Sequence, residues 1–172
     1  MEEQRFLLAL EFAGNLLDVL PQPFRLRFSA QGKDRSHTPD FLCVGREGTW
    51  LIDVRPADLV EEDDLVLFAA SAEAALTAGW RYLVVTGLQP IVWGVLDALS
   101  ARRREMDDPL GLEGQLLAAV EAGPLAFGEL VEATVLPAVA RAHAIHLLWH
   151  RRLDMDLSQP LTDSALIRQA RS

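Results

Sequence analysis

The stretch from residue 37 to residue 56 limits the fold more than any other part of the chain, because it reads as two apolar strands joined by a tight polar turn. Gly45-Arg46-Glu47-Gly48 provides the turn, and the flanking residues are expected to pair symmetrically about its centre. This register places Asp40 opposite Asp53, and directly opposed residues on one face have Cβ atoms about 5 Å apart. Arg55 lies two residues beyond Asp53 and projects from the same face. The hairpin therefore predicts two carboxylates and a guanidinium at one end of a strand pair.

Two carboxylates at this distance repel each other unless a proton or a cation lies between them. Mg²⁺, or Mn²⁺ in its place, prefers oxygen ligands, commonly one or two carboxylates with water and phosphate oxygens. A neighbouring cation such as Arg55 stabilises charge that develops on a phosphate. The order Pro-Asp, hairpin, Asp-x-Arg is close to the PD-(D/E)XK nuclease pattern and predicts a metal-dependent site at Asp40 and Asp53. The alternative is an ordinary strand start with a surface ion pair between Asp53 and Arg55.

Apolar side chains on both faces of the hairpin predict helices on both sides of the sheet. Residues 60–79 show apolar residues at helical spacing, and residues 80–86 read as a further strand. Strand, helix and strand in this order imply a parallel pair, so the sheet is expected to be mixed. A chain of 172 residues, half of them apolar, can bury such a core. The predicted fold class is therefore α/β, with a mixed sheet flanked by helices.

The net charge of −9 argues against a broadly basic surface that binds nucleic acid. A local basic cluster is nevertheless present, where residues 24–28 alternate apolar and basic side chains and residues 31–36 read as a polar turn. This cluster either lines a path for DNA or forms a solvated strand edge. The chain alone is expected to bind DNA poorly and to depend on a partner. The candidate DNA-contacting residues are Arg25, Arg27, Lys33, Arg35 and His37.

The single cysteine, Cys43, lies in an apolar strand and is expected to be a buried, inert thiol. One cysteine and no export signal favour a cytoplasmic location. No apolar run approaches the length of a membrane span, so no membrane partner is expected.

The sequence pattern changes near residues 105–109, which read as a linker between a first domain, 1–104, and a second domain, 110–172. The second domain shows three short helical segments followed by two sides of a small β-wing, at 154–157 and 160–161. This order is typical of a winged-helix-like α+β domain, which docks DNA or protein. Acidic residues outnumber arginines beyond residue 104, which favours a protein partner.

Two histidines on the third of these helical segments have a spacing that occurs among zinc ligands, because His146 and His150 are four residues apart. Leu147 follows His146, so the His-Glu-x-x-His protease motif is absent. Packing of both imidazoles in the domain core is favoured over metal binding.

A set of short segments spread over nearly the whole chain supports a resemblance to a known family through its order and spacing. The segments are Glu3-Gln4-Arg5-Phe6-Leu7-Leu8, Gln22-Pro23-Phe24, His37-Thr38-Pro39-Asp40-Phe41, Ile52-Asp53-Val54-Arg55, Gly79-Trp80, Val135-Leu136-Pro137, His146-Leu147-Leu148-Trp149 and Asp156-Leu157-Ser158. With them the chain resembles the TnsA-like endonuclease subunits of heteromeric transposases, of actinobacterial type, within the PD-(D/E)XK superfamily.

The resemblance implies a restriction-endonuclease-like domain followed by a winged-helix domain. It also implies Mg²⁺-dependent hydrolysis of DNA at the 5′ ends of a mobile element, beside an integrase-type transposase subunit and an AAA+ ATPase regulator. Asp40 matches the family's metal-binding aspartate, and Asp53 and Arg55 occupy the first and last positions of its Glu/Gln-x-Lys motif. The family's helix glutamate falls on Glu3, with Glu2 as the alternative. The implied metal ligands are Asp40, Asp53 and Glu3.

Two departures from the family pattern bear on activity. Arg55 replaces the motif lysine, and a guanidinium stays charged, so it serves a developing phosphate charge but not proton abstraction. Glu3 lies near a helix terminus that is prone to fraying. An alternative function follows, in which a weakened or inactive nuclease fold acts as a docking scaffold for the transposase and ATPase partners. A winged-helix regulator unrelated to transposition is the third hypothesis.

Overall fold

The computed structural model describes residues 2–14 and 16–170. The chain divides into two compact units between Leu88 and Gln89. The first unit contains a mixed sheet with flanking helices, and the second combines helices with a small antiparallel sheet. The predicted α/β class is confirmed at this level. Within the described ranges, every helix is too short or too polar to cross a membrane.

The first unit is built on four strands: β1 (Leu16–Pro21), β4 (Phe41–Gly45), β5 (Gly48–Val54) and β6 (Arg81–Val85). They form one sheet in the order β1-β4-β5-β6. β4 pairs antiparallel with both β1 and β5, whereas β5 and β6 are parallel. α2 (Glu62–Thr77) connects the parallel pair, as the strand–helix–strand pattern predicts. The expectation of a mixed sheet is therefore confirmed.

The central hairpin of β4 and β5 has the predicted register. Phe41 pairs with Ile52 and Gly45 with Gly48, which leaves a turn of two residues. Gly48 has a φ of 127°, a backbone conformation that residues with a Cβ rarely adopt. Glycine at this position therefore permits the tight return of the chain.

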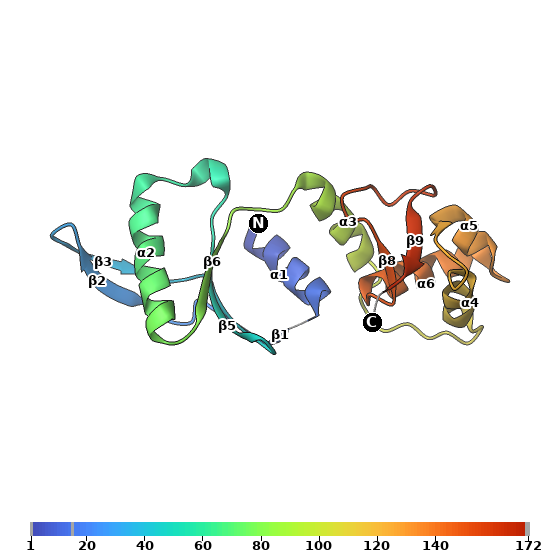
Figure 1. The fold of residues 1–172 in the computed structure, drawn as a ribbon, viewed down its shortest axis with the longest axis horizontal. Helices are drawn as coiled ribbons and strands as arrows, with labels where there is room; N and C mark the ends of the chain where they lie inside the picture. Colours follow the sequence, from blue (N-terminus) through green and yellow to red (C-terminus); the bar gives the residue numbers. More distant parts are fainter. Residues whose placement is uncertain (1, 15, 171–172) are drawn as a thin grey trace. The chain divides into compact units, whose positions relative to one another are not determined.

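Helices cover both faces of the sheet, with α1 (Glu2–Ala13) on one face and α2 on the other (Figure 1). Beneath α1 lies a cluster of buried side chains from the helix and the central hairpin: Phe6, Phe41, Cys43 and Ile52. Burial raises the pKa of the Cys43 thiol to about 11, so this cysteine is protonated at neutral pH. The first turn of α2 is rich in acidic residues, which favour the positive end of the helix dipole.

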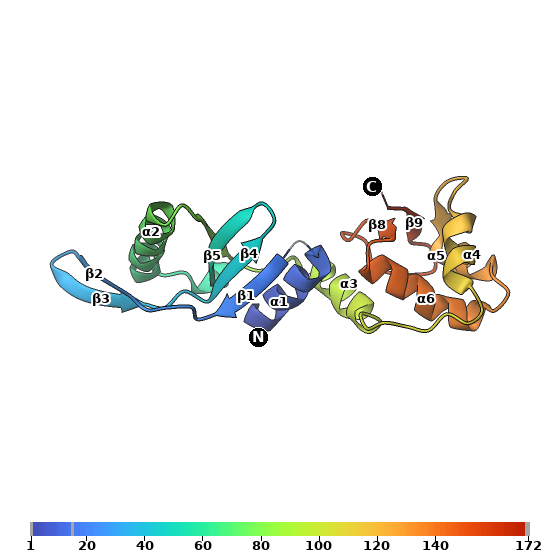
Figure 2. The ribbon, with the colours of Figure 1, turned by 90° about the horizontal axis from the view of Figure 1, so that it is seen from below.

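A second hairpin, β2 (Leu26–Ala30) and β3 (Lys33–His37), forms a separate two-stranded sheet in the first unit (Figure 2). The sequence predicts a strand at 24–28 but only a turn at 31–36, so β3 corrects that expectation. β3 has no apolar alternation, and its extended conformation is stabilised by pairing with β2 and by contact with α2. The hairpin contains most of the predicted basic cluster.

In its described residues, the second unit has these elements: α3 (Pro90–Ser100), α4 (Leu112–Ala119), β7 (Leu125–Ala126), α5 (Phe127–Glu132), α6 (Pro137–Trp149), β8 (Leu153–Met155) and β9 (Leu166–Gln169). The strands form an antiparallel sheet in the order β7-β9-β8. α6 is central to the unit, because α3, α4, α5 and β8 all contact it. Leu116, Leu130 and Leu147, each fully buried, lie in the core.

The boundary between the units falls earlier than the predicted linker at 105–109. Residues 1–104 were expected to form one domain, but α3 groups with the second unit. Val95, Leu96 and Leu99 of α3 are buried, and α3 contacts α6. The amphipathic pattern of α3 predicts a buried face but does not specify which neighbour covers it.

The second side of the predicted wing is also displaced along the chain. β8 lies close to the expected strand at 154–157, but its partner β9 begins at Leu166 rather than near residue 160. The carboxylate of Asp156 accepts a hydrogen bond from the Ser158 backbone N–H at 2.9 Å, which turns the intervening chain. Ile167 then pairs with Met155 and is fully buried, which explains the strand position.

Candidate functional site

Asp40 and Asp53 lie at the same end of the central hairpin. Asp40 directly precedes β4, and the pairing of Phe41 with Ile52 brings Asp53 opposite it. The Asp40 Oδ2 accepts a hydrogen bond from the backbone N–H of Val54, the residue after Asp53, at 2.7 Å. The hairpin thus brings the two predicted carboxylates to adjacent positions, because its register is set by the short turn.

Asp53 is almost completely buried, with 2% of its surface exposed, and both of its oxygens have hydrogen-bond partners. Its Oδ1 lies 2.8 Å from the Nε2 of His37, and its Oδ2 accepts a hydrogen bond from the Tyr82 hydroxyl at 2.6 Å. A carboxylate oxygen accepts more than one bond, so each keeps the capacity for a further interaction. The two partners hold the Asp53 carboxylate in one orientation.

The charges around this carboxylate shift the pKa values of its neighbours. The hydrogen bond to Asp53 raises the pKa of His37 above its ordinary value, against the opposing effect of burial. Burial raises the pKa of the Tyr82 hydroxyl strongly, and the bond to Asp53 raises it further. His37 therefore carries its proton to higher pH than a free imidazole, whereas Tyr82 stays neutral.

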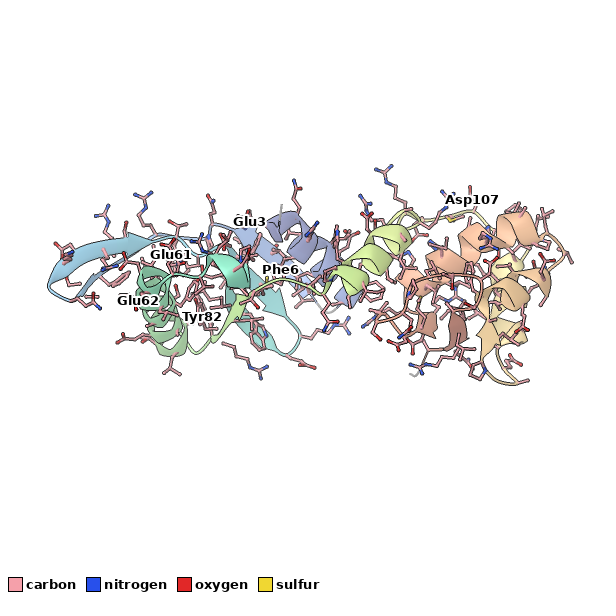
Figure 3. The ribbon with its side chains drawn as sticks, turned by 90° about the horizontal axis from the view of Figure 1, so that it is seen from above. Glu3, Phe6, Glu61, Glu62, Tyr82 and Asp107 are labelled. Atoms are coloured by element: carbon pink, nitrogen blue, oxygen red, sulfur yellow. The ribbon has the colours of Figure 1, made fainter. Side chains whose placement is uncertain are left out.

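Glu3 approaches the site from α1. Burial is the main cause of the raised pKa of Asp40, and the negative charges of Asp53 and Glu3 add to it. One turn along α1 from Glu3, Phe6 packs its ring 5.7 Å from that of Phe41, centroid to centroid, which holds the helix over the start of β4 (Figure 3). The side chain of Glu2, the alternative, lies outside the part of the chain that the structure describes.

The carboxylates of Glu3, Asp40 and Asp53 are the donor type that Mg²⁺ prefers, so these residues fit such an ion chemically. The donor oxygens of these three carboxylates do not form a cluster within 4.8 Å of one another. Among the described residues, the one group of three donors within 4.8 Å of one another belongs to the second unit. The partly buried Asp40 carboxyl, which the negative charges of Asp53 and Glu3 repel, is the observation in the first unit that is consistent with a cation, because a cation offsets that repulsion.

The side chain of Arg55 forms an ion pair with α2. Its Nε donates to the Oδ2 of Asp64 at 3.0 Å, and the same oxygen accepts the backbone N–H of Glu61. The backbone N–H of Arg55 donates to the Val85 carbonyl oxygen and so continues the hydrogen-bond ladder between β5 and β6. Figure 3 shows Glu61 with Glu62 at the start of α2, where this ion pair forms. The position that matches the motif lysine therefore has a defined structural partner.

The predicted DNA-contacting residues fall into two groups on the β2–β3 hairpin and its approach. Three of them are exposed: Arg25, Arg27 and Lys33. The other two point inward, because Arg35 pairs with Asp63 of α2 at 3.0 Å and His37 with Asp53. His37 thus belongs to the carboxylate site. Arg35 and His37 point the same way because alternate residues of a strand share a face.

Tyr82 is the site residue that sequence reasoning missed. A signal was present, because a tyrosine in an otherwise aliphatic strand carries a hydroxyl that needs a partner when buried. The parallel register pairs Leu51 with Tyr82, which places the tyrosine on the same sheet face as Asp53, two residues beyond Leu51. That register depends on the length and packing of α2 and cannot be read from the strand itself.

In comparisons with known proteins, the chain matches no family model and no curated protein. A functional conclusion therefore depends on the residues and geometry of the site together with the motif resemblance.

Proposed function

We propose that this chain is the metal-dependent DNA endonuclease subunit of a heteromeric transposase, which cuts DNA at the 5′ ends of a mobile element. The main support is the convergence of Asp40 and Asp53 at one end of the central hairpin, with Asp53 held by His37 and Tyr82. The charge of Glu3 reaches the same place. The mixed sheet flanked by helices is of the type that the resemblance to TnsA-like subunits implies.

The reaction is hydrolysis of a phosphodiester, in which a water oxygen attacks phosphorus and one phosphorus–oxygen ester bond breaks. A divalent cation, when bound, polarises the phosphate and lowers the pKa of a coordinated water. Asp40 and Asp53 hold that cation in this proposal, and Glu3 contributes a carboxylate that binds it or orients the water. His37 and Tyr82 fix the orientation of Asp53, and each of its oxygens keeps the capacity for a further interaction.

Arg55 supplies positive charge in this mechanism. A guanidinium stays protonated and has five N–H donors, of which the Nε–H is used by Asp64. Its remaining donors suit a phosphate oxygen that gains charge as the ester bond breaks. Proton abstraction is not assigned to Arg55, so a carboxylate or solvent takes the proton of the attacking water.

The second unit supplies the docking function in this proposal. Its order of α4, β7, α5, α6, β8 and β9 supports assignment as a winged-helix-like domain. The excess of acidic residues in this region favours a protein partner, either the integrase-type transposase subunit or the AAA+ ATPase regulator. Such a complex binds DNA in the cytoplasm, and the exposed basic residues of the β2–β3 hairpin are proposed to contact that DNA.

Reconstitution tests the assignment of the site. The chain, the transposase subunit encoded beside it and element-end DNA are incubated with Mg²⁺ or Mn²⁺, and cleavage at the 5′ ends is measured. Asp40→Ala is expected to lower cleavage by at least about 100-fold, since a direct ligand matters at least as much as the groups that orient one. Asp58→Ala changes an exposed aspartate of the same unit and is the matched control. Equal cleavage by Asp40→Ala and Asp58→Ala would refute the site.

A non-catalytic docking scaffold is the second candidate, and a specific observation favours it. The polar groups of the site are already paired within the chain, since Asp53 bonds to two side chains and Arg55 to Asp64. In that case the wild-type chain shows no calorimetric heat with Mg²⁺ or Mn²⁺ and no cleavage, while it still binds the transposase subunit. Binding of one of these ions that Asp40→Ala abolishes supports the nuclease instead.

A further inference from the structure

A second group of potential metal ligands lies in the second unit and is separate in sequence from the carboxylates of the hairpin. Asp108 precedes α4, Glu113 lies in its first turn, and His143 is on α6. One donor atom from each of these three side chains lies within 4.8 Å of the other two. His146, one helical turn beyond His143, faces the same glutamate, because its Nε2 is 3.9 Å from Glu113 Oε1.

His143 is the residue that points to a ligand. It is buried, with 3% of its surface exposed, and its Nδ1 has no hydrogen-bond partner among the described residues. The nearest carboxylate oxygen, Glu113 Oε1, is 3.6 Å from this nitrogen, which is too far for a hydrogen bond. A buried polar atom without a partner costs free energy and commonly marks a missing ion or water.

The two distances from Glu113 Oε1 fit two ligands of one ion better than hydrogen bonds. Zinc binds imidazole nitrogen and carboxylate oxygen at about 2.0–2.2 Å, so tetrahedral ligand atoms lie roughly 3.3 Å apart. The observed 3.6 Å to His143 Nδ1 and 3.9 Å to His146 Nε2 exceed that spacing by a few tenths of an ångström. Asp108, Glu113 and His143 already have donor atoms within 4.8 Å of one another, so the side chain of His146 has to move toward them to complete the site.

The tautomer of His146 is set for metal binding. Its Nδ1 lies 2.9 Å from the backbone carbonyl oxygen of Arg102, and a carbonyl only accepts, so Nδ1 carries the proton. In the neutral ring Nε2 then presents its lone pair toward Glu113. Metal-binding histidines usually donate their other nitrogen to a carbonyl or carboxylate in this way.

The remaining contacts around the cluster orient its two carboxylates. Arg152 pairs with the other glutamate oxygen, Oε2, at 2.7 Å, so Oε1 stays directed to the imidazoles. The Asp108 oxygens accept the backbone N–H groups of Leu112 and Glu113 at 2.8 and 2.9 Å, which positions this carboxylate at the start of α4. With His143 and His146 neutral, the two carboxylates and Arg152 sum to a single negative charge.

We propose that the second unit binds one zinc ion through His143 Nδ1, His146 Nε2, Glu113 Oε1 and a carboxylate oxygen of Asp108. Two imidazoles with two carboxylates favour zinc over Mg²⁺, because Mg²⁺ prefers oxygen alone and keeps several waters. Four protein ligands make a closed site, which is typical of a structural ion. The ion joins α6 to α4 and to the segment before α4, and so stabilises the second unit.

The test uses the full chain, stripped with a chelator and titrated with ZnCl₂ by calorimetry in the presence of excess Mg²⁺. One zinc ion per chain is expected, together with a rise in thermal midpoint that increases with zinc concentration. Co²⁺ in place of zinc is expected to give the intense visible bands of a tetrahedral site. A chain that binds no zinc, or that loses it to Mg²⁺, overturns the proposal.

Ligand variants locate the ion. His143→Ala and Glu113→Gln are expected to weaken zinc binding by about 100-fold or more, whereas His150→Ala is the matched control on the same helix. His150 is exposed at the end of the same helix, lies with its Nε2 3.2 Å from the Arg103 carbonyl oxygen and packs its ring at a tilt against that of His146, so it is a neighbouring histidine that is not a proposed ligand. If His143→Ala does not fold, Glu113→Gln decides the question, because glutamine keeps the shape. Zinc affinity that is unchanged in Glu113→Gln, or lost in Asp40→Ala, overturns the assignment.

Discussion

At the scale of single residues, the candidate site in the first unit depends on how Asp53 is held. A buried carboxylate is costly unless its oxygens are bonded, and His37 and Tyr82 provide those bonds. Both partners come from outside the central hairpin, one from β3 and one from β6. Each of these two contacts leads to a prediction.

The first concerns His37, whose pKa is raised by its hydrogen bond to Asp53. A raised pKa in the folded state means that this pair stabilises the fold fully below about pH 6.5, the ordinary histidine value. That contribution is lost as the pH rises through the raised pKa. Asp53→Asn is expected to lower the pKa of His37 toward its ordinary value, measured by NMR titration of the imidazole. An unchanged His37 titration would contradict the contact, and the second-unit histidines provide the internal control.

The second concerns Tyr82, the one tyrosine of the chain. Burial raises its pKa, so the phenol is neutral in the folded protein and this contribution to stability is lost as the pH rises above about 10. Phenolate absorbance is therefore expected to develop only as the chain unfolds in alkali. Tyr82→Phe leaves an Asp53 oxygen without its donor and is expected to lower the free energy of unfolding by about 1–3 kcal/mol, measured with urea. Phenolate absorbance near pH 10 in the folded protein would show that the hydroxyl is accessible.

At the scale of secondary-structure elements, the central hairpin depends on the backbone conformation of one residue. Gly48 has a φ of 127°, and a Cβ added there meets no atom within 4 Å, so strain rather than collision decides the effect. Gly48→Ala is expected to destabilise the chain by about 1 kcal/mol or more. Gly94→Ala is the control, because Gly94 is exposed inside α3, where alanine is expected to stabilise by about 0.5–1 kcal/mol. Thermal unfolding that ranks the two variants in the reverse order would contradict this account of the turn.

The β2–β3 hairpin gives a prediction about DNA, which rests on the proposed function. Arg27 is exposed on β2, so Arg27→Ala is expected to remove one phosphate contact from the complex with the transposase subunit. The slope of log affinity against log salt then falls by about one, with little dependence on DNA sequence. Fluorescence anisotropy at several salt concentrations measures this slope. Arg46→Ala changes an exposed arginine of the other hairpin, and an equal effect there would remove the special role of β2.

At the scale of the whole molecule, the chain divides before α3 rather than after it. A fragment of residues 89–172 is therefore expected to fold cooperatively. A fragment of residues 105–172 lacks Val95, Leu96 and Leu99, whose burial contributes about 1.5–3 kcal/mol each. That loss is comparable to the whole stability of a small domain, so the shorter fragment is expected to be largely unfolded. Circular dichroism with urea unfolding compares the two, and equal midpoints would support the later boundary.

The sequence by itself determined the central hairpin, its register and the position of Asp40 opposite Asp53. The reason is that a two-residue turn followed by Gly48 leaves one way to pair the strands. Local periodicity likewise identified α2 and β6, whose apolar spacing is independent of distant contacts. These features follow from interactions between residues close in the chain.

Only the tertiary structure decided which distant residues contact that hairpin. It turned His37 to Asp53, brought Tyr82 alongside, paired Arg55 with Asp64 and placed α3 with the second unit. It also gathered Asp108, Glu113 and His143 from separate segments. The physical reason is that a polar or apolar pattern shows that a side chain needs a partner, whereas the packing of distant elements selects which partner is present.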